Sequence, residues 1–383
     1  MAGDLPPGAG GVGDQRPLMR VTYCSIVDAG FLPRFLVMHE GLAAHTDGAE
    51  LHVLCMDDVV HDVLSHASLA GTRLITLDVL ESFRPGLEAA TRERTLSETC
   101  WTAKPVLCAF LLDRAPGIDA LAYVDADLAF YADPAAALAS SSEWSALIVP
   151  HRAPPGATWE ATHGVYNAGF VAFRGSEARE IVEWWSDRCI EWCFDRVEPT
   201  RYTDQKYLDD WPDRYRGARV LESPGMGLAP WNGRDVHVQR QDGRLYAERD
   251  RLVFYHFQSL RLYRGFTLPR RVGLAGRRYG LTHAGEAVVW AVDRSYEIPG
   301  DQAALLYAPY IRRVVEQIER VAALGVDVER SYRDLPVGEV IGEAIRDLLP
   351  GPIRRQLRRA RASIDPARRR SAQPHANAGD TSR

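Results

Sequence analysis

The stretch Leu121–Asp127, LAYVDAD, is an apolar run of strand length that passes directly into two aspartates one residue apart. The apolar run predicts a buried strand over Leu121–Val124. In open α/β sheets ligands bind at the carboxyl ends of the strands, so we expect Asp125 and Asp127 to point together into a binding crevice. Two neighbouring carboxylates repel each other unless a cation lies between them, and hard oxygen ligands suit Mg²⁺ or Mn²⁺. The alternative is a solvated turn.

Before this stretch, short β-rich segments alternate with segments that carry apolar residues at helical spacing. Strands are predicted at Val21–Val27, Leu51–Met56 and Arg73–Leu77, and helices at Leu32–His45 and Val59–His66. This alternation predicts an α/β fold with a mostly parallel central sheet and helices on both faces. Thr95 and Glu98 have the spacing of a capping box at the start of a further helix. Pro105 is expected in the first turn of that helix or at a restart, because proline cannot donate an interior hydrogen bond.

The second half of the chain is expected to complete the sheet and then to continue as a helical extension. Helices are predicted at Glu180–Phe194, Ala303–Ala323 and, interrupted by proline, Val337–Ala362, and a late strand at Leu252–Phe257. The domains predicted on this basis are a disordered leader at 1–16, a catalytic domain at 17–270, a helical C-terminal region at 271–370 and a disordered tail at 371–383.

The composition is that of an ordinary globular protein. Of 383 residues, 46% are hydrophobic, and the formal net charge of -5 gives no signature of nucleic-acid binding. The six cysteines lie mostly in apolar runs and form no CxxC pair. This pattern favours buried, reduced thiols over a disulfide framework or a zinc site. The first residues lack the apolar core of a signal peptide and no stretch reaches transmembrane length, so we expect a cytoplasmic protein.

Lysine is rare in this arginine-rich chain, and its only occurrences are Lys104 and Lys206. Arginine cannot replace lysine where a compact point charge is needed. Lys104 would suit the diphosphate of a sugar nucleotide, because its charge would balance the phosphates beside a metal. The alternatives are chance and a solvated lysine at the start of a helix.

His256 lies in the apolar late strand, where it shares one face with Leu252 and Phe254. A lone histidine in a strand is often a core residue whose hydrogen bonds are satisfied within the protein. Late in an α/β fold, however, it can reach the crevice from a neighbouring strand. An imidazole beside two carboxylates forms a suitable Mn²⁺ site.

Two further groups place small or polar residues beside apolar segments. The first group is 167–169 and the second is 203–205. Asn167, Asp204 and Gln205 offer the hydrogen bonds that a sugar needs, and Gly169 permits a close approach of the backbone. The alternative for the first group is an ordinary turn. The alternative for the second is a helix N-cap, with Asp204 capping a helix over 205–209.

Seven motifs occur in one order along the chain. They are TLSETCWTAKP, YVDADLAFYADP, YNAGFVAF, WWSDRCIEWC, TDQKYLDDWP, GLAPWN and FYHF, and they are preceded by YCSIVDAGFLPRFLVMHEGLAAH. The ordered set resembles bacterial GT-A glycosyltransferases of the nucleotide-diphospho-sugar transferase superfamily, found in surface-polysaccharide clusters. It is similar to glycosyltransferase family eight, the glycogenin and lipopolysaccharide galactosyltransferase group. The resemblance covers roughly Val21–Leu262.

The resemblance implies a GT-A (Rossmann-like) fold, a UDP-sugar donor and transfer with retention of configuration to a saccharide, lipid-linked or small-molecule acceptor. It implies a Mn²⁺ or Mg²⁺ ion bound by Asp125, Asp127 and His256, and a diphosphate neutralised by Lys104. The nucleotide base would be lined by Cys24, Ser25, Ile26 and Val27. Asn167 would contact the donor sugar, and Asp204 and Gln205 would flank its anomeric carbon. One departure is clear. Family-eight enzymes often follow the histidine with a glycine and Lys-Pro-Trp, whereas this chain reads HFQSLRLYRGF, so Arg261 or Arg264 would have to replace that lysine.

Other functions fit the sequence less well or remain open. A nucleotidyltransferase would carry a Gly-rich, Arg-containing loop after the first strand, and 27–31 has no such signature. A phosphatase would carry its aspartate pair after the first strand, whereas in this chain the pair follows the later predicted strand Leu121–Val124. A non-catalytic sugar- or nucleotide-binding protein on a degenerate GT-A fold stays open, although the complete set of polar residues favours an enzyme.

The predicted C-terminal helix carries a cluster of basic residues, Arg354, Arg355, Arg358, Arg359 and Arg361. Such a cluster beside a short apolar strip predicts peripheral contact with an anionic membrane at its inner face. The alternatives are a solvated basic tail and a helix packed on the catalytic core.

Overall fold

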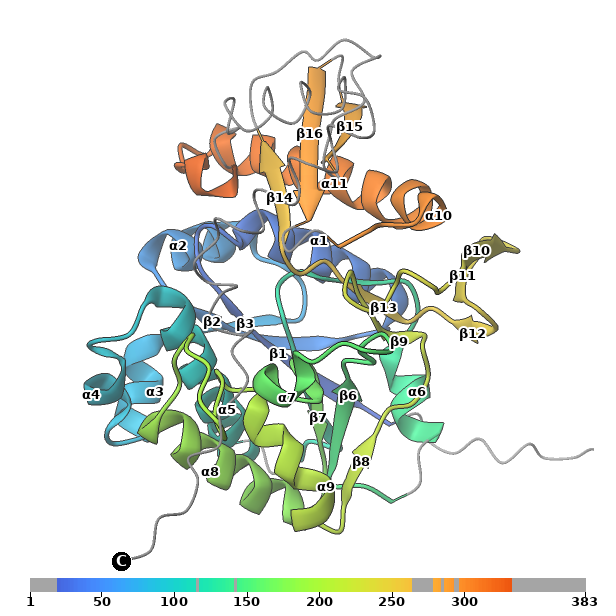
Figure 1. Ribbon diagram of the computed structural model, residues 1–383. Coiled ribbons are helices and arrows are strands. Elements are labelled where there is room, and N and C mark those ends of the chain that lie inside the picture. The colour runs from blue at the N-terminus through green and yellow to red at the C-terminus, as the bar shows by residue number, and fades with distance from the viewer. Residues whose placement is uncertain are drawn as a thin grey trace, which may run out of the picture. The chain divides into compact units, whose positions relative to one another are not determined.

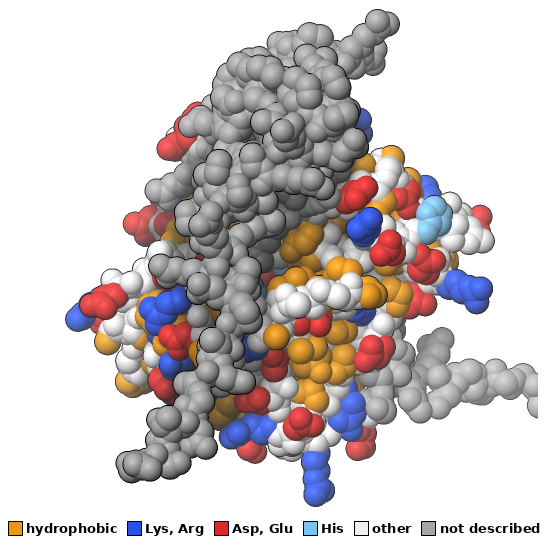
Figure 2. Space-filling view, viewed as in Figure 1, with side chains coloured by type: hydrophobic (Ala, Val, Ile, Leu, Met, Phe, Trp, Pro, Cys, Tyr) orange, Lys and Arg blue, Asp and Glu red, His pale blue; other side chains and the backbone are white. Residues whose placement is uncertain are grey.

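The computed structural model describes residues 19–114, 117–140, 143–263, 278–283, 286–292 and 296–332. They form two compact units, one made of the described residues through Leu260 together with Tyr296–Tyr332, the other of the described residues between Arg261 and Ser295. The predicted leader, the basic helix at Val337–Ala362 and the tail lie outside the described residues. On the face shown in Figure 2, acidic and basic side chains are interspersed, in keeping with the small net charge.

The first unit is built on a central sheet with the strand order β3-β2-β1-β4-β7-β6-β8 (Figure 1). Its strands are β1 (Val21–Val27), β2 (Glu50–Cys55), β3 (Thr72–Thr76), β4 (Ala120–Val124), β6 (Ala146–Pro150), β7 (Tyr166–Phe173) and β8 (Ala218–Val220). β7 pairs antiparallel with β4 and β6, and the other pairings of this sheet are parallel. The predicted α/β fold with a mostly parallel sheet is confirmed.

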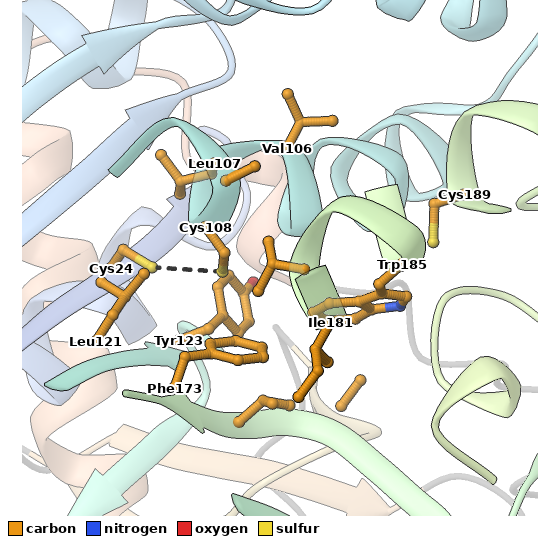
Figure 3. Close-up of a cluster of buried hydrophobic side chains, with 14 of the residues drawn as sticks. Cys24, Val106, Leu107, Cys108, Leu121, Tyr123, Phe173, Ile181, Trp185 and Cys189 are labelled. Atoms are coloured by element: carbon orange, nitrogen blue, oxygen red, sulfur yellow. Dashed lines mark hydrogen bonds between the residues drawn. The ribbon is translucent and has the colours of Figure 1, made fainter. Parts of the chain in front are cut away.

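Helices cover both faces of this sheet. They are α1 (Leu32–His45), α2 (Asp58–Ala67), α3 (Leu77–Phe83), α4 (Leu87–Thr91), α5 (Leu96–Arg114), α6 (Pro134–Ser140), α7 (Glu160–His163), α8 (Ser176–Glu191), the 3-10 helix η1 (Lys206–Asp210) and α9 (Trp211–Arg214). α5 and α8 pack against each other on one face, and α1 lies on the opposite face (Figure 1). A hydrophobic cluster lies between α5, α8 and the sheet, and it includes Tyr123, Phe173 and Trp185 (Figure 3).

Smaller elements complete the first unit. Two short sheets are formed by β5 (Leu128–Phe130), β13 (Phe254–His256) and β9 (Met226–Leu228), and by β10 (Val238–Gln241), β11 (Arg244–Ala247) and β12 (Asp250–Arg251). A helical segment follows, made of α10 (Gly300–Gln302), the π-helix η3 (Ala303–Tyr307) and α11 (Ala308–Ala323). The 3-10 helix η4 (Glu329–Ser331) comes after it. Gln317 on α11 donates to Glu40 on α1 at 2.6 Å, and Arg313 also donates to Glu40.

The second unit contains an antiparallel pair, β15 (Arg278–His283) and β16 (Glu286–Val292). β14 (Leu260–Tyr263) pairs with β16 in the same three-stranded sheet. Across the described residues of both units, no helix is long and apolar enough to cross a membrane.

The start of α5 shows why local sequence signals succeed there. Thr95 N–H donates to Glu98 Oε2 at 2.8 Å, and Glu98 N–H donates to Thr95 Oγ1 at 3.3 Å, so the predicted capping box is confirmed. The second carboxylate oxygen of Glu98 accepts from Asp195 N–H at 2.8 Å, beyond the end of α8. Arg94 donates to the carbonyls of Cys189 and Ile190 in the last turn of α8 at 2.9 and 2.8 Å. The first turn of α5 is thus fastened to the last turn of α8.

The prediction for Pro105 is wrong. α5 runs unbroken from Leu96 to Arg114, and Pro105 lies in its interior. Proline there costs the hydrogen bond to the carbonyl of Trp101. The buried contacts of α5 with α8 and the sheet offset that cost, because this helix is held by packing rather than by propensity.

The late strand is shorter than predicted and does not join the central sheet. β13 covers only Phe254–His256 and pairs with β5 and β9. The other predicted strands and helices in the described part lie within a few residues of their predicted bounds, although α8 ends at Glu191 and leaves Cys193 outside the helix.

Candidate metal centre

Asp125, Asp127 and His256 converge at the carboxyl end of β4. The two aspartates follow Val124 directly, and β5 begins immediately after them. β5 pairs antiparallel with β13 in a register that sets His256 opposite Leu128, next to Asp127. His256 Nε2 lies 3.1 Å from Asp127 Oδ1 and 3.8 Å from Asp125 Oδ2. One ligand atom from each residue lies within 4.8 Å of the other two.

The chemistry of this triad fits a hard divalent cation. Two carboxylate oxygens and one imidazole nitrogen form a donor set suited to Mn²⁺ or Mg²⁺. Burial alone would lower the pKa of His256, but the carboxylates of Asp127 and Asp125 raise it above its ordinary value. Burial opposes ionisation of Asp127 as well, yet the His256 ring holds the pKa of that carboxyl below its ordinary value. The cluster therefore favours the charged form of Asp127 despite its burial.

β7 passes so close to the triad that only glycine fits at position 169. A Cβ on Gly169 would lie 2.6 Å from His256 Cε1 and 2.9 Å from Asp125 Oδ2. The carbonyl of Gly169 accepts from Asp125 N–H at 2.8 Å, which fixes the first aspartate to the sheet. Asn167 Oδ1 accepts from Gly169 N–H at 2.9 Å. The predicted close approach of the backbone at Gly169 is confirmed.

Lys104 extends from α5 into a buried site beside Asp125. Its Nζ lies 2.8 Å from Asp204 Oδ2 and 3.4 Å from Asp125 Oδ1, and it donates to the carbonyl of Ala168 at 3.1 Å. The ring of Tyr123 lies 4.7 Å from the same nitrogen. The ammonium group is therefore within ion-pair distance of two carboxylates and donates a hydrogen bond to a backbone carbonyl. Lys104 is therefore a buried lysine in the interior of α5 and not a solvated lysine at the start of a helix, and its predicted role at the diphosphate stays a prediction.

Asp204 and Gln205 lie on a tight turn rather than at a helix cap. Thr203 has a φ of 46°, a left-handed conformation that a β-branched residue rarely adopts. The following segment is the 3-10 helix η1, whose N-cap is Gln205 with no side-chain capping bond, so the capping interpretation of Asp204 is wrong. Burial raises the pKa of Asp204, and Lys104 opposes that shift. Gln205 Nε2 donates to the carbonyl of His163 at 2.8 Å.

No protein-family model matches the sequence. The chain is 33% identical over 250 residues to the uncharacterized protein YfnD of Bacillus subtilis (strain 168), a match that covers 64% of this chain and 78% of YfnD. The chain belongs to the YfnD family. It is also 28% identical over 253 residues to the uncharacterized protein YfnF of the same strain, covering 64% of this chain and 83% of YfnF.

Among solved structures, this YfnD-family chain is similar to the galactosyltransferase LgtC in complex with donor and acceptor sugar analogs. The TM-score is 0.42 at 16% identity, covering 62% of this chain and 87% of LgtC. It is also similar to mouse xyloside xylosyltransferase 1 in its apo form, with a TM-score of 0.41 at 12% identity, covering 62% of this chain and 97% of that chain.

The predicted nucleotide-binding residues of the YfnD-family protein lie in β1, which is buried throughout. The side chains of Cys24 and Ile26 belong to the hydrophobic cluster, and Cys24 Sγ lies 4.0 Å from Cys108 Sγ (Figure 3). The side chains of Ser25 and Val27 point to the opposite face, as alternation along a strand requires. Cys24 and Ile26 can therefore meet a nucleotide only through their backbone atoms. All six cysteines of the chain are free.

Sequence reasoning missed two contributors to the site of this YfnD-family protein. Tyr123 donates its hydroxyl to Asp125 Oδ1 at 2.9 Å, and the period of two along β4 is the signal that places Tyr123 and Asp125 on one side. Trp231 packs edge to face on His256, with ring centroids 5.5 Å apart, and its indole N–H donates to the carbonyl of His151 at 2.9 Å. No local sequence pattern reveals Trp231, because its partners His256 and His151 are distant from it in the sequence.

Proposed function

We propose that this YfnD-family protein is a glycosyltransferase of the GT-A type. It moves a sugar from a nucleotide-diphosphate sugar, a UDP-sugar by resemblance, to an acceptor hydroxyl, and the product retains the anomeric configuration. The observation that carries the proposal is the convergence of Asp125, Asp127 and His256 at the carboxyl end of β4. The ordered motifs of family eight fall on the same residues.

Asp125, Asp127 and His256 would hold a divalent ion, Mn²⁺ or Mg²⁺, which would supply charge stabilisation for the departing diphosphate. The protein's own groups orient those ligands. Tyr123 and Lys104 both contact Asp125 Oδ1, and His256 contacts Asp127. Side chains that are already held in the ligating arrangement bind an ion without the free-energy cost of rearranging first.

Asp204 and Gln205 are proposed to flank the anomeric carbon of the donor. Lys104 joins Asp204 to the metal ligand Asp125, so the two parts of the site keep a fixed spacing. An anionic carboxylate near the anomeric carbon would stabilise positive charge that develops there. Asn167, whose side chain lies between Gly169 N–H and the His151 ring, is proposed to contact the donor sugar. Lys104 acts in this proposal as a positioning residue.

The biological setting of the proposal follows from the resemblance. It is surface polysaccharide or glycoconjugate biosynthesis, with a saccharide, lipid-linked or small-molecule acceptor. Arg264 and the basic segment 354–361 lie outside the described residues. Replacement of the family lysine by Arg261 or Arg264, and contact of that segment with an anionic membrane, stay predictions.

Release of UDP from a panel of UDP-sugars tests the proposal. We expect one donor to be hydrolysed or transferred with added Mn²⁺ and not in excess chelator, and Asp127→Asn to abolish release. Asp119→Asn is the matched control, because Asp119 is exposed at the opposite end of β4 and accepts only from Arg20 N–H among the described contacts. Binding of UDP without release from any donor would instead support a non-catalytic nucleotide-binding protein.

A further inference from the structure

A series of aromatic contacts leads from the metal centre, through Trp231, to the segment between β6 and β7. The ring of Trp231 lies 5.5 Å from that of His256 and 5.4 Å from that of His151. The His151 ring lies 5.1 Å from that of Trp159, which lies 6.5 Å from that of His163. Trp231 and His151 are buried, whereas Trp159 and His163 are partly exposed at α7. The series therefore begins at a metal ligand and ends at the surface.

The exposed end of this series is held firmly in place. Three contacts join the α7 region to the turn that carries Asp204 and to η1, which follows it. Gln205 Nε2 of the turn donates to the carbonyl of His163 at 2.8 Å. In η1, Lys206 Nζ donates to the carbonyl of Ala161 at 2.9 Å, and Asp209 Oδ1 accepts from Val165 N–H at 2.7 Å. A Cβ on Gly164 would lie 3.2 Å from Lys206 Cα, so the two segments are in close backbone contact. The backbone of α7 is thus tied to Gln205, the residue next to Asp204.

The surface that these rings offer has the chemistry of a carbohydrate site. A partly exposed indole presents an apolar face to the C–H groups of a pyranose, and polar groups beside it set the orientation of the hydroxyls. Among the described residues, the indole N–H of Trp159 has no protein acceptor, so it is available to a hydroxyl. The nearby charges are partnered, because Lys206 pairs with Asp209 at 3.4 Å and Glu160 accepts from Ala153 N–H at 3.0 Å. A neutral sugar suits this surface better than a phosphate.

We propose that Trp159 and His163 form the subsite for a neutral acceptor saccharide. The proposal rests on the proposed glycosyltransferase function and adds the part of the site that receives the acceptor. Figure 2 shows hydrophobic side chains gathered on the face of the molecule where Figure 1 places α7, with acidic side chains at their margin. The ring series connects this subsite to His256, so the acceptor and the metal would lie at the two ends of one rigid assembly.

Saturation-transfer difference NMR with a panel of methyl glycosides and neutral disaccharides tests the subsite directly. We expect at least one saccharide to bind the full-length chain with saturation concentrated on one face of its ring. Trp159→Ala should weaken this binding at least tenfold, and Trp159→Phe should keep most of it. Trp184→Ala is the matched control, because Trp184 is a partly exposed indole that packs on Tyr215 and Arg214 instead.

Binding of UDP with Mn²⁺, measured by calorimetry on the same variants, separates this proposal from the one on which it rests. Intact UDP binding by Trp159→Ala together with lost saccharide binding supports the subsite. Equal saccharide binding by Trp159→Ala and the wild type, or no saccharide binding by the wild type, overturns it. Failure of the wild type to bind UDP with Mn²⁺ would count against the proposed function and not against the aromatic subsite.

Discussion

The ammonium of Lys104 and the carboxylate of Asp204 lie 2.8 Å apart, and each side chain is only 4% exposed. These residues come from α5 and from the turn before η1, so one ion pair fixes the distance between two elements of the site. Taking one partner away leaves the other charged and buried, which is far more costly than removing both.

Loss of Lys104 should therefore destabilise the protein strongly. We expect Lys104→Met to lower the free energy of unfolding by about 3–5 kcal/mol, as is typical when one partner of a buried pair is removed. The double variant Lys104→Met/Asp204→Leu should recover much of this stability but no UDP release. Urea denaturation and a UDP-release assay on both variants check the prediction. A stable single variant with full activity would show that the pair is dispensable.

Divalent metal should stabilise the folded protein through the triad. A ligand that binds only the native state at one hundred times its dissociation constant adds about 2.7 kcal/mol to the free energy of unfolding. We expect Mn²⁺ to raise the melting temperature of the wild type and of Asp119→Asn, and to leave that of His256→Ala unchanged. An equal rise in all three proteins would place the metal elsewhere.

Gly169 should tolerate no side chain. The Cβ of alanine would lie 2.6 Å from His256 Cε1, and the imidazole is already packed against Trp231. We expect Gly169→Ala to cost about 1–3 kcal/mol of stability by overpacking and to abolish Mn²⁺-dependent UDP release. Gly117→Ala, at a position with open space around it, should change neither quantity. Unchanged release by Gly169→Ala would mean that the triad can shift without loss.

Glu98 should make the stability of the protein depend on acid pH. Burial alone would raise its pKa, but hydrogen bonds from the N–H groups of Asp195 and Thr95 hold the pKa of Glu98 below its ordinary value. A depressed folded-state pKa gives stability that is present above the unfolded value and is lost as the pH falls through the folded value. We expect Glu98→Gln to cost about 1–2 kcal/mol at neutral pH.

That difference should shrink as the pH falls below about 4.5, the ordinary pKa of a glutamate side chain. Denaturation curves of both proteins across this range provide the measurement. Glu88→Gln removes only a pair with Arg92 on the exposed surface of α4, so it should be nearly neutral at every pH. A constant cost of Glu98→Gln at all pH values would contradict the prediction.

Retention of configuration is expected in the product. Asp204 is bound to Lys104, and Gln205 is engaged with the carbonyl of His163, so neither is arranged as a base for the acceptor hydroxyl. The anomeric proton coupling of the purified product decides the point. An inverted linkage would remove the proposed roles of both residues.

Much of the fold and the three metal-binding candidates could be predicted from the sequence, because their signals are local. A buried strand that runs into Asp125 and Asp127 identifies the ligand-binding end of β4, and an apolar late strand carries His256. The partners of Lys104 could not be predicted, since its burial depends on how α5 packs against β4 and β7. The local preference of Asp204 for a helix cap is overridden by the same ion pair.

β7 runs against both of its neighbours, so the first residues of this strand, rather than its last, lie beside the aspartates that follow β4. The polar start of β7 is therefore connected to segment 151–165, which leaves the sheet after Pro150 and rejoins it at Tyr166. The two ends of this segment are joined by a hydrogen bond from His151 N–H to the carbonyl of Val165 at 2.8 Å. An insertion, deletion or exchange within this segment leaves every strand ladder of the sheet intact. Evolution can thus vary the stretch 154–158 of this segment, most of which is exposed, without disturbing the strands, and we expect lineages of the YfnD family to diverge in length and composition there long before they diverge in β1 or β4.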